Sequence, residues 1–347
     1  VEITQYGSTR SINAGAAAGR GGEWLIDPYD YTIGASQAAT IVSSLNNGTS
    51  VTVSTVAPGG LSGYTAPSGS GDITVNSAIA KTAGGDATLT LRADRNIAVN
   101  QSITSTSGAL GLTLSAANNA SGALGGVRVA SGVTLDSNGG KILIGGAGGS
   151  LADAQTLSNG IGYALNASAS LEAVSIGSSA RVLSRGGDIT INGYSTQPKA
   201  GSNDTTGVRI GASAIIDSGY YAPGAVDAAS GGYINISGKY AGPASTVFGV
   251  KIENPSGNSG QTTLSASTTT GSIRIEGSST YDVDGSYALN MATGGLAGNI
   301  YFNAYSVADL IFILNGVSKG WCSHTVGRTP AAVAATRTAA CCRSPPA

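Results

Sequence analysis

The chain has 347 residues, of which 11% are charged and 41% are hydrophobic, and its formal net charge is −1. The 18 Lys and Arg residues are spread along the chain, so no clustered basic patch indicates a nucleic-acid partner. Only 3 Phe and 1 Met are present, which excludes a globular core of bulky side chains and favours a thin core of Ile, Val and Leu.

The N-terminal stretch VEITQYGSTR lacks the charged start and apolar core of a signal peptide. No run of about 18 apolar residues predicts a transmembrane helix. Because the chain opens on Val1 in the middle of a pattern, we expect a segment of a longer protein whose export signal lies upstream.

The segment GEWLIDPYDYTI (residues 22–33) gathers a Trp, two Tyr, a Pro and three acidic residues. Its WLI and YTI pieces are predicted to be short strands joined by a DPYD corner, because Pro fixes φ and Asp side chains bond nearby backbone N–H groups. Glu23, Asp27 and Asp30 could instead form a carboxylate cluster. Acid–base catalysis needs partners with separated pKa values, and no His or Lys lies nearby. A structural joint is therefore favoured over catalysis or ligand binding.

The same short strand recurs after a Gly, with apolar and polar residues in alternation. In GDITI (187–191) this alternation predicts that Ile189 points into a core and Asp188 points outward. Gly at each strand start fits a tight corner, where φ > 0 is common. The first family of strands is GDITV (71–75), GDATLTL (85–91), GKILI (140–144), GDITI, GYINI (232–236), GSIRI (271–275) and GNIYF (298–302). A second family interleaves with the first: GVRVASGVTL (126–135), GIGYAL (160–165), GVRIGASAII (207–216), GVKI (249–252) and GSYALN (285–290).

From residue 126 onward, successive starting glycines are 13 to 27 residues apart, which predicts an all-β solenoid with coils of roughly 20 residues. A sandwich would need hairpin turns every 8 to 12 residues and different residues in each strand, whereas here one strand is rewritten with variable insertions. Flexible disorder is the other reading of such a Gly- and Ser-rich chain, and the regular alternation argues against it. One elongated solenoid is expected over residues 1–309.

A family resemblance rests on GEWLIDPYDYTI, on ATIVSSLNNGTSVTVST (39–55) and on the alternating strands from 71 to 116, which include ADRNIAVN. Together these residues resemble the repeat-bearing shaft of filamentous haemagglutinin-like proteins, which are large bacterial exoproteins of the two-partner secretion type. The likeness is closest over residues 1–116 and looser beyond. It implies a right-handed parallel β-helix, export through an outer-membrane transporter partner, and adhesion or matrix assembly at the cell surface. The family's secretion domain has no counterpart in these residues.

Two polar stretches are candidate sites, and a structural role explains each of them better than a functional one. Asp94-Arg95-Asn96 lies between two alternating strands, where a solenoid corner needs polar residues, and an exposed Asp–Arg pair adds little stability. Asp282 and Asp284 resemble part of a calcium loop, but the EF-hand spacing and the Gly-rich nonapeptide of calcium-binding β-rolls are both absent.

A carbohydrate-active β-helix enzyme, a polysaccharide lyase or hydrolase, is the strongest alternative function, because such enzymes group acidic or basic residues on one face. Its candidate residues here are Asp188, Asp204, Arg209 and Asp217. A crystal-face or ice-binding surface would need regular Thr-x-Thr rows, and pieces such as Thr88-Leu89-Thr90 are isolated in the sequence.

The C-terminal segment 310–347 is set apart, because it contains all three Cys (Cys322, Cys341 and Cys342) and the only His, and lacks Asp and Glu. A Ser-His-Asp triad would have to use His324 from this segment, and the Cys spacing does not match an ordinary zinc site. An exported solenoid usually avoids unpaired thiols. We expect this tail to be disordered, read in a shifted frame, or part of a truncated chain.

The sequence therefore predicts a structural and adhesive segment of a secreted or cell-surface bacterial protein, facing the exterior of the outer membrane. It is not expected to be an enzyme, and we assign it no catalytic residue, no cofactor and no metal. Expected partners are the outer-membrane transporter during export, and then host or surface glycans, proteins or other copies of the chain.

Overall fold

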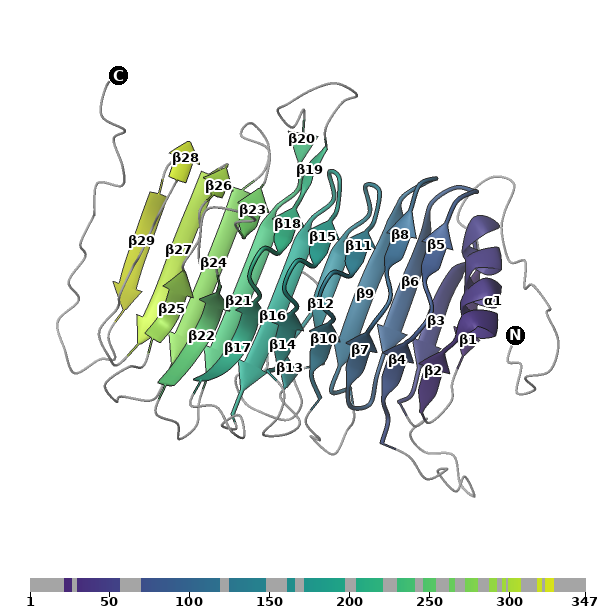
Figure 1. The fold of residues 1–347 in the computed structure, drawn as a ribbon, viewed down its shortest axis with the longest axis horizontal. Helices are drawn as coiled ribbons and strands as arrows, with labels where there is room; N and C mark the ends of the chain where they lie inside the picture. Colours follow the sequence, from purple (N-terminus) through teal and green to yellow (C-terminus); the bar gives the residue numbers. More distant parts are fainter. Residues whose placement is uncertain are drawn as a thin grey trace.

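The computed structural model of this chain describes residues 22–26, 30–56, 70–118, 125–147, 161–165, 172–196, 204–220, 230–240, 246–253, 262–265, 272–279, 287–291, 295–297, 299–306, 317–319 and 322–327. These residues form a parallel β-helix, in which the chain visits three sheets in turn and stacks coil upon coil (Figure 1). Every strand pair within the three sheets is parallel and in register, apart from a register shift between β26 and β28.

The three sheets are named A, B and C in the order in which a coil visits them. Sheet A holds β1 (Glu23–Ile26), β3 (Ser50–Ser54), β6 (Ala87–Arg92), β9 (Leu110–Ala116), β12 (Ile142–Gly146), β16 (Ile189–Ser195), β21 (Ile234–Tyr240), β24 (Ser272–Ser279), β27 (Asn299–Ser306) and β29 (Cys322–Gly327), with β13 (Ala164–Leu165) paired to β16. Sheet B holds β2 (Tyr31–Ile33), β4 (Ile73–Val75), β7 (Ile97–Val99), β10 (Val127–Val129), β14 (Val174–Ile176), β17 (Asp204–Ile210), β22 (Thr246–Ile252) and β25 (Tyr287–Met291). Sheet C holds β5 (Ile79–Lys81), β8 (Ile103–Ser105), β11 (Thr134–Asp136), β15 (Arg181–Leu183), β18 (Ile215–Asp217), β23 (Thr263–Ser265), β26 (Gly295–Ala297) and β28 (Val317–Lys319).

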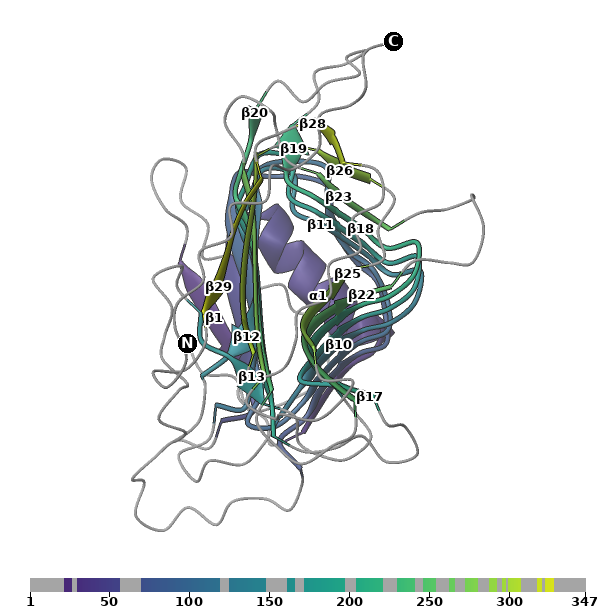
Figure 2. The same cartoon turned by 90° about the vertical axis from the view of Figure 1, so that its left-hand side faces the viewer.

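Seen along the axis, sheet A forms one wall and sheets B and C together form the opposite side (Figure 2). Inward-facing Ile, Val and Leu residues stack in register and fill the space between the walls. Each such side chain, once buried, contributes about 1.5–3 kcal/mol. Two columns of fully or almost fully buried residues run along sheet A: Val51, Leu89, Leu112, Ile142, Ile189, Ile234 and Ile273, and beside them Val53, Leu91, Leu114, Ile144, Ile191, Ile236 and Ile275.

All the predicted strands are strands in the structure, but the two families serve different sheets. Most of the first family builds sheet A and most of the second builds sheet B, so one coil contains a member of each. The exceptions are GDITV, which is β4 in sheet B, and GIGYAL, whose end is β13 in sheet A. The spacing between consecutive starting glycines therefore corresponds to only part of a coil, and not to a whole one.

Coil length, read from the register, varies along the chain. Ile73 pairs with Ile97 and Ile79 with Ile103, a repeat of 24 residues that lies close to the expected 20. Ile142 pairs with Ile189, 47 residues later, because a longer stretch of chain separates β12 from β14. The expected 20 residues are therefore too few for the longer coils.

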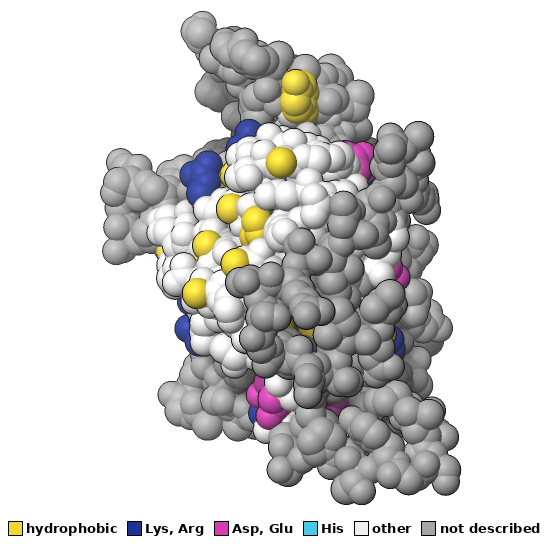
Figure 3. All heavy atoms as spheres, turned by 90° about the vertical axis from the view of Figure 1, so that its right-hand side faces the viewer, with side chains coloured by type: hydrophobic (Ala, Val, Ile, Leu, Met, Phe, Trp, Pro, Cys, Tyr) yellow, Lys and Arg dark blue, Asp and Glu magenta, His cyan; other side chains and the backbone are white. Residues whose placement is uncertain are grey.

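Helix α1 (Ala35–Asn46) was not predicted, and it takes the place of a sheet C strand in the first coil. Its buried residues Ala38, Ile41 and Leu45 are spaced for one face of a helix, and they pack toward β5 and β3. Gly48, with φ of 73°, ends it in the left-handed conformation common after helices. The helix lies across the N-terminal end of the core, where Figure 3 shows hydrophobic side chains only as small separate patches among polar ones.

Glycine is required for space at the sheet A strand starts Gly140, Gly187 and Gly232, whereas a Cβ on Gly85 would meet no atom within 4 Å. The expected φ > 0 is found at Gly71, before β4 of sheet B, and not at these sheet A positions. A Cβ on Gly187 would lie 2.2 Å from the carbonyl oxygen of Gly140, and a Cβ on Gly232 would lie 2.1 Å from that of Gly187. The positive φ angles fall one residue earlier, at Gly139 and Gly186. These glycines let the backbones of consecutive coils touch at the corner between sheets C and A.

Sheets A and B also meet at glycines within their longer strands β16, β17, β21 and β22. A Cβ on Gly193 would lie 2.2 Å from the carbonyl oxygen of Gly207, and one on Gly238 would lie 1.9 Å from that of Gly249. No side chain fits between the two sheets at these points.

A small second cluster lies outside the main core and joins Ala117, Tyr163, Leu165 and Tyr194. The Tyr163 hydroxyl is 2.8 Å from the Ser237 hydroxyl, and the Lys239 ammonium lies 5.0 Å from the centre of the Tyr163 ring. Ser237 alternates with inward residues of β21, so the segment that carries Tyr163 covers part of the outer face of sheet A.

Strands β28 and β29 continue sheets C and A into the segment after residue 309. The structure describes no further residues beyond 327. The boundary at residue 309, and the expectation of a shifted frame or disorder beyond it, stay predictions.

Candidate functional site

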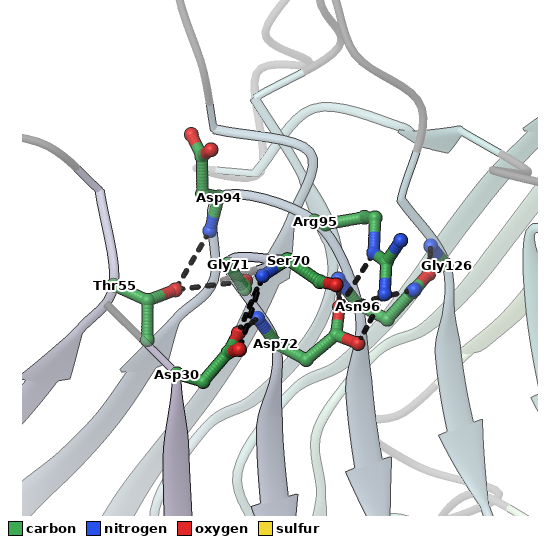
Figure 4. A network of polar contacts seen from close by, with 9 residues as sticks. All are labelled: Asp30, Thr55, Ser70, Gly71, Asp72, Asp94, Arg95, Asn96 and Gly126. Carbon is green, nitrogen blue, oxygen red and sulfur yellow. Dashed lines mark hydrogen bonds and ion pairs between the residues drawn. The ribbon is translucent and has the colours of Figure 1, made fainter. Parts of the chain in front are cut away.

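The most regular polar feature is a ladder at the corner between sheets A and B, at the position just before each of the first three sheet B strands (Figure 4). The Asp30 carboxylate accepts the backbone N–H of Asp72 at 2.8 Å, the Asp72 carboxylate accepts that of Asn96 at 3.0 Å, and the Asn96 amide oxygen accepts that of Gly126 at 3.0 Å. Each side chain thus pairs a backbone donor of the next coil, at a corner where donors otherwise lack partners.

Further contacts tie neighbouring coils together at the same corner. Arg95 forms a two-point ion pair with Asp72, with Nε–Oδ1 and Nη2–Oδ2 distances of 2.8 and 2.6 Å. The Thr55 hydroxyl donates to the Gly71 carbonyl and accepts the N–H of Asp94, and burial raises the pKa of the Asp94 carboxyl. The prediction that residues 94–96 form a solenoid corner is confirmed.

The opening segment GEWLIDPYDYTI forms the first crossing of this corner. Its two predicted strands are β1 in sheet A and β2 in sheet B. Glu23 accepts a hydrogen bond from the Thr52 hydroxyl in sheet A, whereas Asp30 belongs to the corner ladder. Asp27 lies outside the described residues. The two described carboxylates therefore have separate structural partners.

Asp30 gives this ladder a defined pH dependence. Partial burial raises the pKa of its carboxyl, but hydrogen bonds from the N–H groups of Asp72, Ser70 and Gly71, with the charge of Arg95, outweigh that and hold it below its ordinary value. A depressed pKa in the folded state means that the carboxylate stabilises the fold above the unfolded pKa of about 3.9. That contribution is lost as the pH falls through the lower, folded value.

We therefore expect Asp30→Asn to lower the stability of the N-terminal coils by about 1 kcal/mol at pH 7, with a smaller difference at pH 3 and below. Hydrogen exchange at the amides of Ser70 and Asp72 measures this locally. Serine at position 36, exposed on α1, provides a matched control in Ser36→Ala. Equal exchange in Asp30→Asn and the wild type at pH 7 would contradict the role given to the ladder.

The four residues proposed for a polysaccharide-degrading site are not gathered by the fold. Asp188 precedes β16 of sheet A, Asp204 and Arg209 lie on β17 of sheet B, and Asp217 ends β18 of sheet C. Three of them have partners elsewhere: Lys141 pairs with Asp188 at 2.9 Å, Glu253 pairs with Arg209, and the Asp217 carboxylate accepts the N–H of Gly219.

Another ion pair on the described surface joins one coil to the next in the same way, while Lys251 and Glu253 form a pair within one coil. Arg185 holds Asp136 of the preceding coil through three contacts of 2.6 to 2.9 Å. Such pairs fix the stacking of the coils and leave the charges balanced.

The Thr pieces that are isolated in the sequence are stacked in the structure. Thr52, Thr90 and Thr113 are in-register neighbours on the outer face of sheet A, and Leu143 ends this row in the next coil. The result is a small hydroxyl-bearing face across three strands.

The remaining candidates concern metals and nucleophilic catalysis. Asp282, Asp284, Cys341 and Cys342 lie outside the described residues, and the backbones of Cys322 and His324 belong to β29. Among the described residues, no three His, Cys, Asp or Glu side chains gather closely enough to hold a metal ion. The only helix in the described part is too short to cross a membrane.

A row of buried Ser hydroxyls, which the sequence reading missed, lines the inner corner between sheets C and A. Ser105, Ser137 and Ser184 each donate to the carbonyl of a glycine three residues later. Lys81 occupies the first position of this row, in register with Ser105, and is fully buried. Its ammonium donates to the carbonyls of Ala83, Gly84 and Ser107. A repeated Lys/Ser-x-x-Gly spacing at the corners was the available signal.

Burial lowers the pKa of Lys81, and the nearby charge of Asp86 only partly opposes this. The unfolded chain therefore binds more protons than the folded one between the two pKa values, so this lysine makes stability rise with pH across that window. We expect Lys81→Met to cost about 2 kcal/mol at pH 7, because three carbonyls lose a charged donor. The deficit should widen from pH 7 toward pH 10 in urea unfolding. A deficit that narrows over this range would contradict the assignment.

The fold and these contacts together define a parallel β-helix whose described polar groups are used mainly to join its own coils. Neither the protein-family models nor the curated proteins include a match to this sequence. The resemblance to filamentous haemagglutinin-like shafts therefore stays a prediction from the residues.

Proposed function

We propose that this chain is a structural and adhesive segment of a large secreted bacterial surface protein, which attaches to cells, to matrix or to other copies of itself. The observation that carries the proposal is that charged side chains of this chain pair with one another between adjacent coils. Asp72, Asp136, Asp188 and Glu253 each pair with a cation on an adjacent strand or corner, and the pairs hold the stack.

A stacked rod with balanced charges and short hydroxylated side chains on its outer faces suits attachment. Such a surface is extended and rigid, so weak contacts repeat along it and add through multivalency. Export through an outer-membrane transporter and a position at the cell surface are further parts of the proposal, and they come from the resemblance of residues 1–116.

The carbohydrate-active enzyme is the rival function, since the parallel β-helix fold is compatible with both. It would need carboxylates or basic side chains grouped on one face, but Arg209 lies on sheet B, while Asp217 ends a sheet C strand and Asp188 directly precedes a sheet A strand. Each of the three side chains also has a structural partner of its own. The adhesive function is therefore the better supported of the two.

Bead attachment tests this proposal. Beads coated with the folded chain should attach to host cells, to extracellular matrix or to surfaces carrying the same chain, and beads coated with heat-unfolded chain should not. Equal attachment by folded and unfolded chains, or none by either, would sink the adhesive function.

A further inference from the structure

Among the tyrosines whose burial the structure describes, two have exposed rings and the others are buried. Tyr220 and Tyr233 are 47% and 54% exposed, while Tyr31, Tyr163, Tyr194 and Tyr240 are at most 7% exposed. An exposed aromatic ring forgoes the large stabilisation that its burial would bring, and aromatic rings are enriched where proteins bind partners.

Tyr233 belongs to a short row of side chains at the start of sheet A. Lys141, Asp188 and Tyr233 each directly precede a strand of that sheet, in three consecutive coils. The Lys141 ammonium lies 2.9 Å from the Asp188 carboxylate, which also accepts the N–H of Tyr233 at 3.0 Å. With strands about 4.8 Å apart, the row spans about 10 Å.

Tyr220 approaches this row from a hairpin. Strands β19 (Gly219–Tyr220) and β20 (Ser230–Gly231) form an antiparallel pair that projects beyond the rim between sheets C and A (Figure 1). The Ser218 hydroxyl donates to the Gly232 carbonyl and fixes its base. The Cβ of Tyr220 is 3.6 Å from where a Cβ on Gly186 would lie, two residues before Asp188.

We propose that Tyr220, Tyr233, Asp188 and Lys141 form a binding site for a neutral glycan. The C–H face of a sugar ring packs on an exposed aromatic ring, and its hydroxyls bond to a carboxylate and an ammonium held beside it. The ion pair of Lys141 with Asp188 balances the local charge, which favours a neutral sugar over a sulfated or acidic one. This inference rests on the proposed adhesive function and names its ligand class.

The test compares variants of the full chain on an array of neutral glycans, with affinities then measured by calorimetry. The wild type should retain at least one neutral glycan, and Tyr233→Ala and Tyr220→Ala should each bind it about tenfold more weakly or worse. Tyr233→Trp keeps an aromatic face and should retain binding. Leu25→Ala, which removes an exposed apolar side chain on β1, should bind as the wild type does.

The unfolding temperatures of the tyrosine variants should equal that of the wild type. A loss of binding then reflects the site and not a loss of folded protein. If the wild type attaches to cells or matrix but retains no neutral glycan, the glycan site is wrong while the adhesive function stands. The same holds if both tyrosine variants bind glycans as tightly as the wild type. A chain that attaches to no surface at all overturns both.

Discussion

Replacing Gly238 by alanine should lower the free energy of unfolding by on the order of 3 kcal/mol or more. The added Cβ would lie 1.9 Å from the carbonyl oxygen of Gly249 and 2.7 Å from a methyl of Val250. The first of these neighbours is backbone of β22, and the residues on either side of it, Phe248 and Val250, are paired with the strands of both adjacent coils, so it cannot move aside without disturbing those pairs. Urea unfolding measures the loss, and limited proteolysis should show the first cleavages in the coils that contain β21 and β22.

The matched control is Gly85→Ala. Gly85 has no positive φ, and a Cβ there meets no atom within 4 Å, so the change should stay within about 0.5 kcal/mol. If Gly238→Ala were as stable as Gly85→Ala, sheets A and B would not be in backbone contact at this point.

Ile189→Asp should be comparably severe, by on the order of 4 kcal/mol, and should unfold the neighbouring coils. Ile189 is fully buried between Ile142 and Ile234 of the adjacent coils, so a carboxylate there would have no partner inside the core. Because each coil is stabilised mainly by its neighbours, damage at one coil weakens the stack on both sides. Hydrogen exchange resolved along the chain measures how far the damage spreads.

Asp188→Ala, one residue away, is the control for that experiment. Its carboxylate faces outward and joins Lys141 and the N–H of Tyr233, so its removal should cost about 1 kcal/mol or less. Equal damage from the two substitutions would contradict the inward and outward assignment.

Alternation in short strands was enough to predict the fold class and the facing of residues such as Ile189. The period of two is local, and a register slip of one residue would turn every apolar side chain to solvent. Helix α1 was missed because Ala38, Ile41 and Leu45 occur in a stretch that resembles solenoid repeats. The helical spacing and the Asn47-Gly48 stop were the signals that predict it.

Coil length could not be predicted, because the stretches between strands vary in length and their sequence does not show which strands stack. Nothing local to Ile142 indicates that its partner lies 47 residues later. For the same reason, the sequence placed Asp188, Arg209 and Asp217 in one candidate group, although Arg209 lies on sheet B and the two aspartates lie at the corner between sheets C and A.

The polar corner at residues 94–96 was predictable from its composition, whereas the position of Tyr220 beside Gly186, two residues before Asp188, was not. Tyr220 reaches that position through a hairpin inserted between β18 and β21, and proximity of this kind depends on tertiary structure. Lys81 was missed because a single lysine at the end of a short strand is usually exposed.

Incubating the purified chain with a panel of soluble and insoluble polysaccharides, while recording both retention and the release of new sugar ends, tests the central claim most directly. An adhesive β-helix should be retained on at least one surface without releasing sugar ends. Release of new ends, lost on substitution of Asp188, Arg209 or Asp217, would make the chain an enzyme and contradict the account.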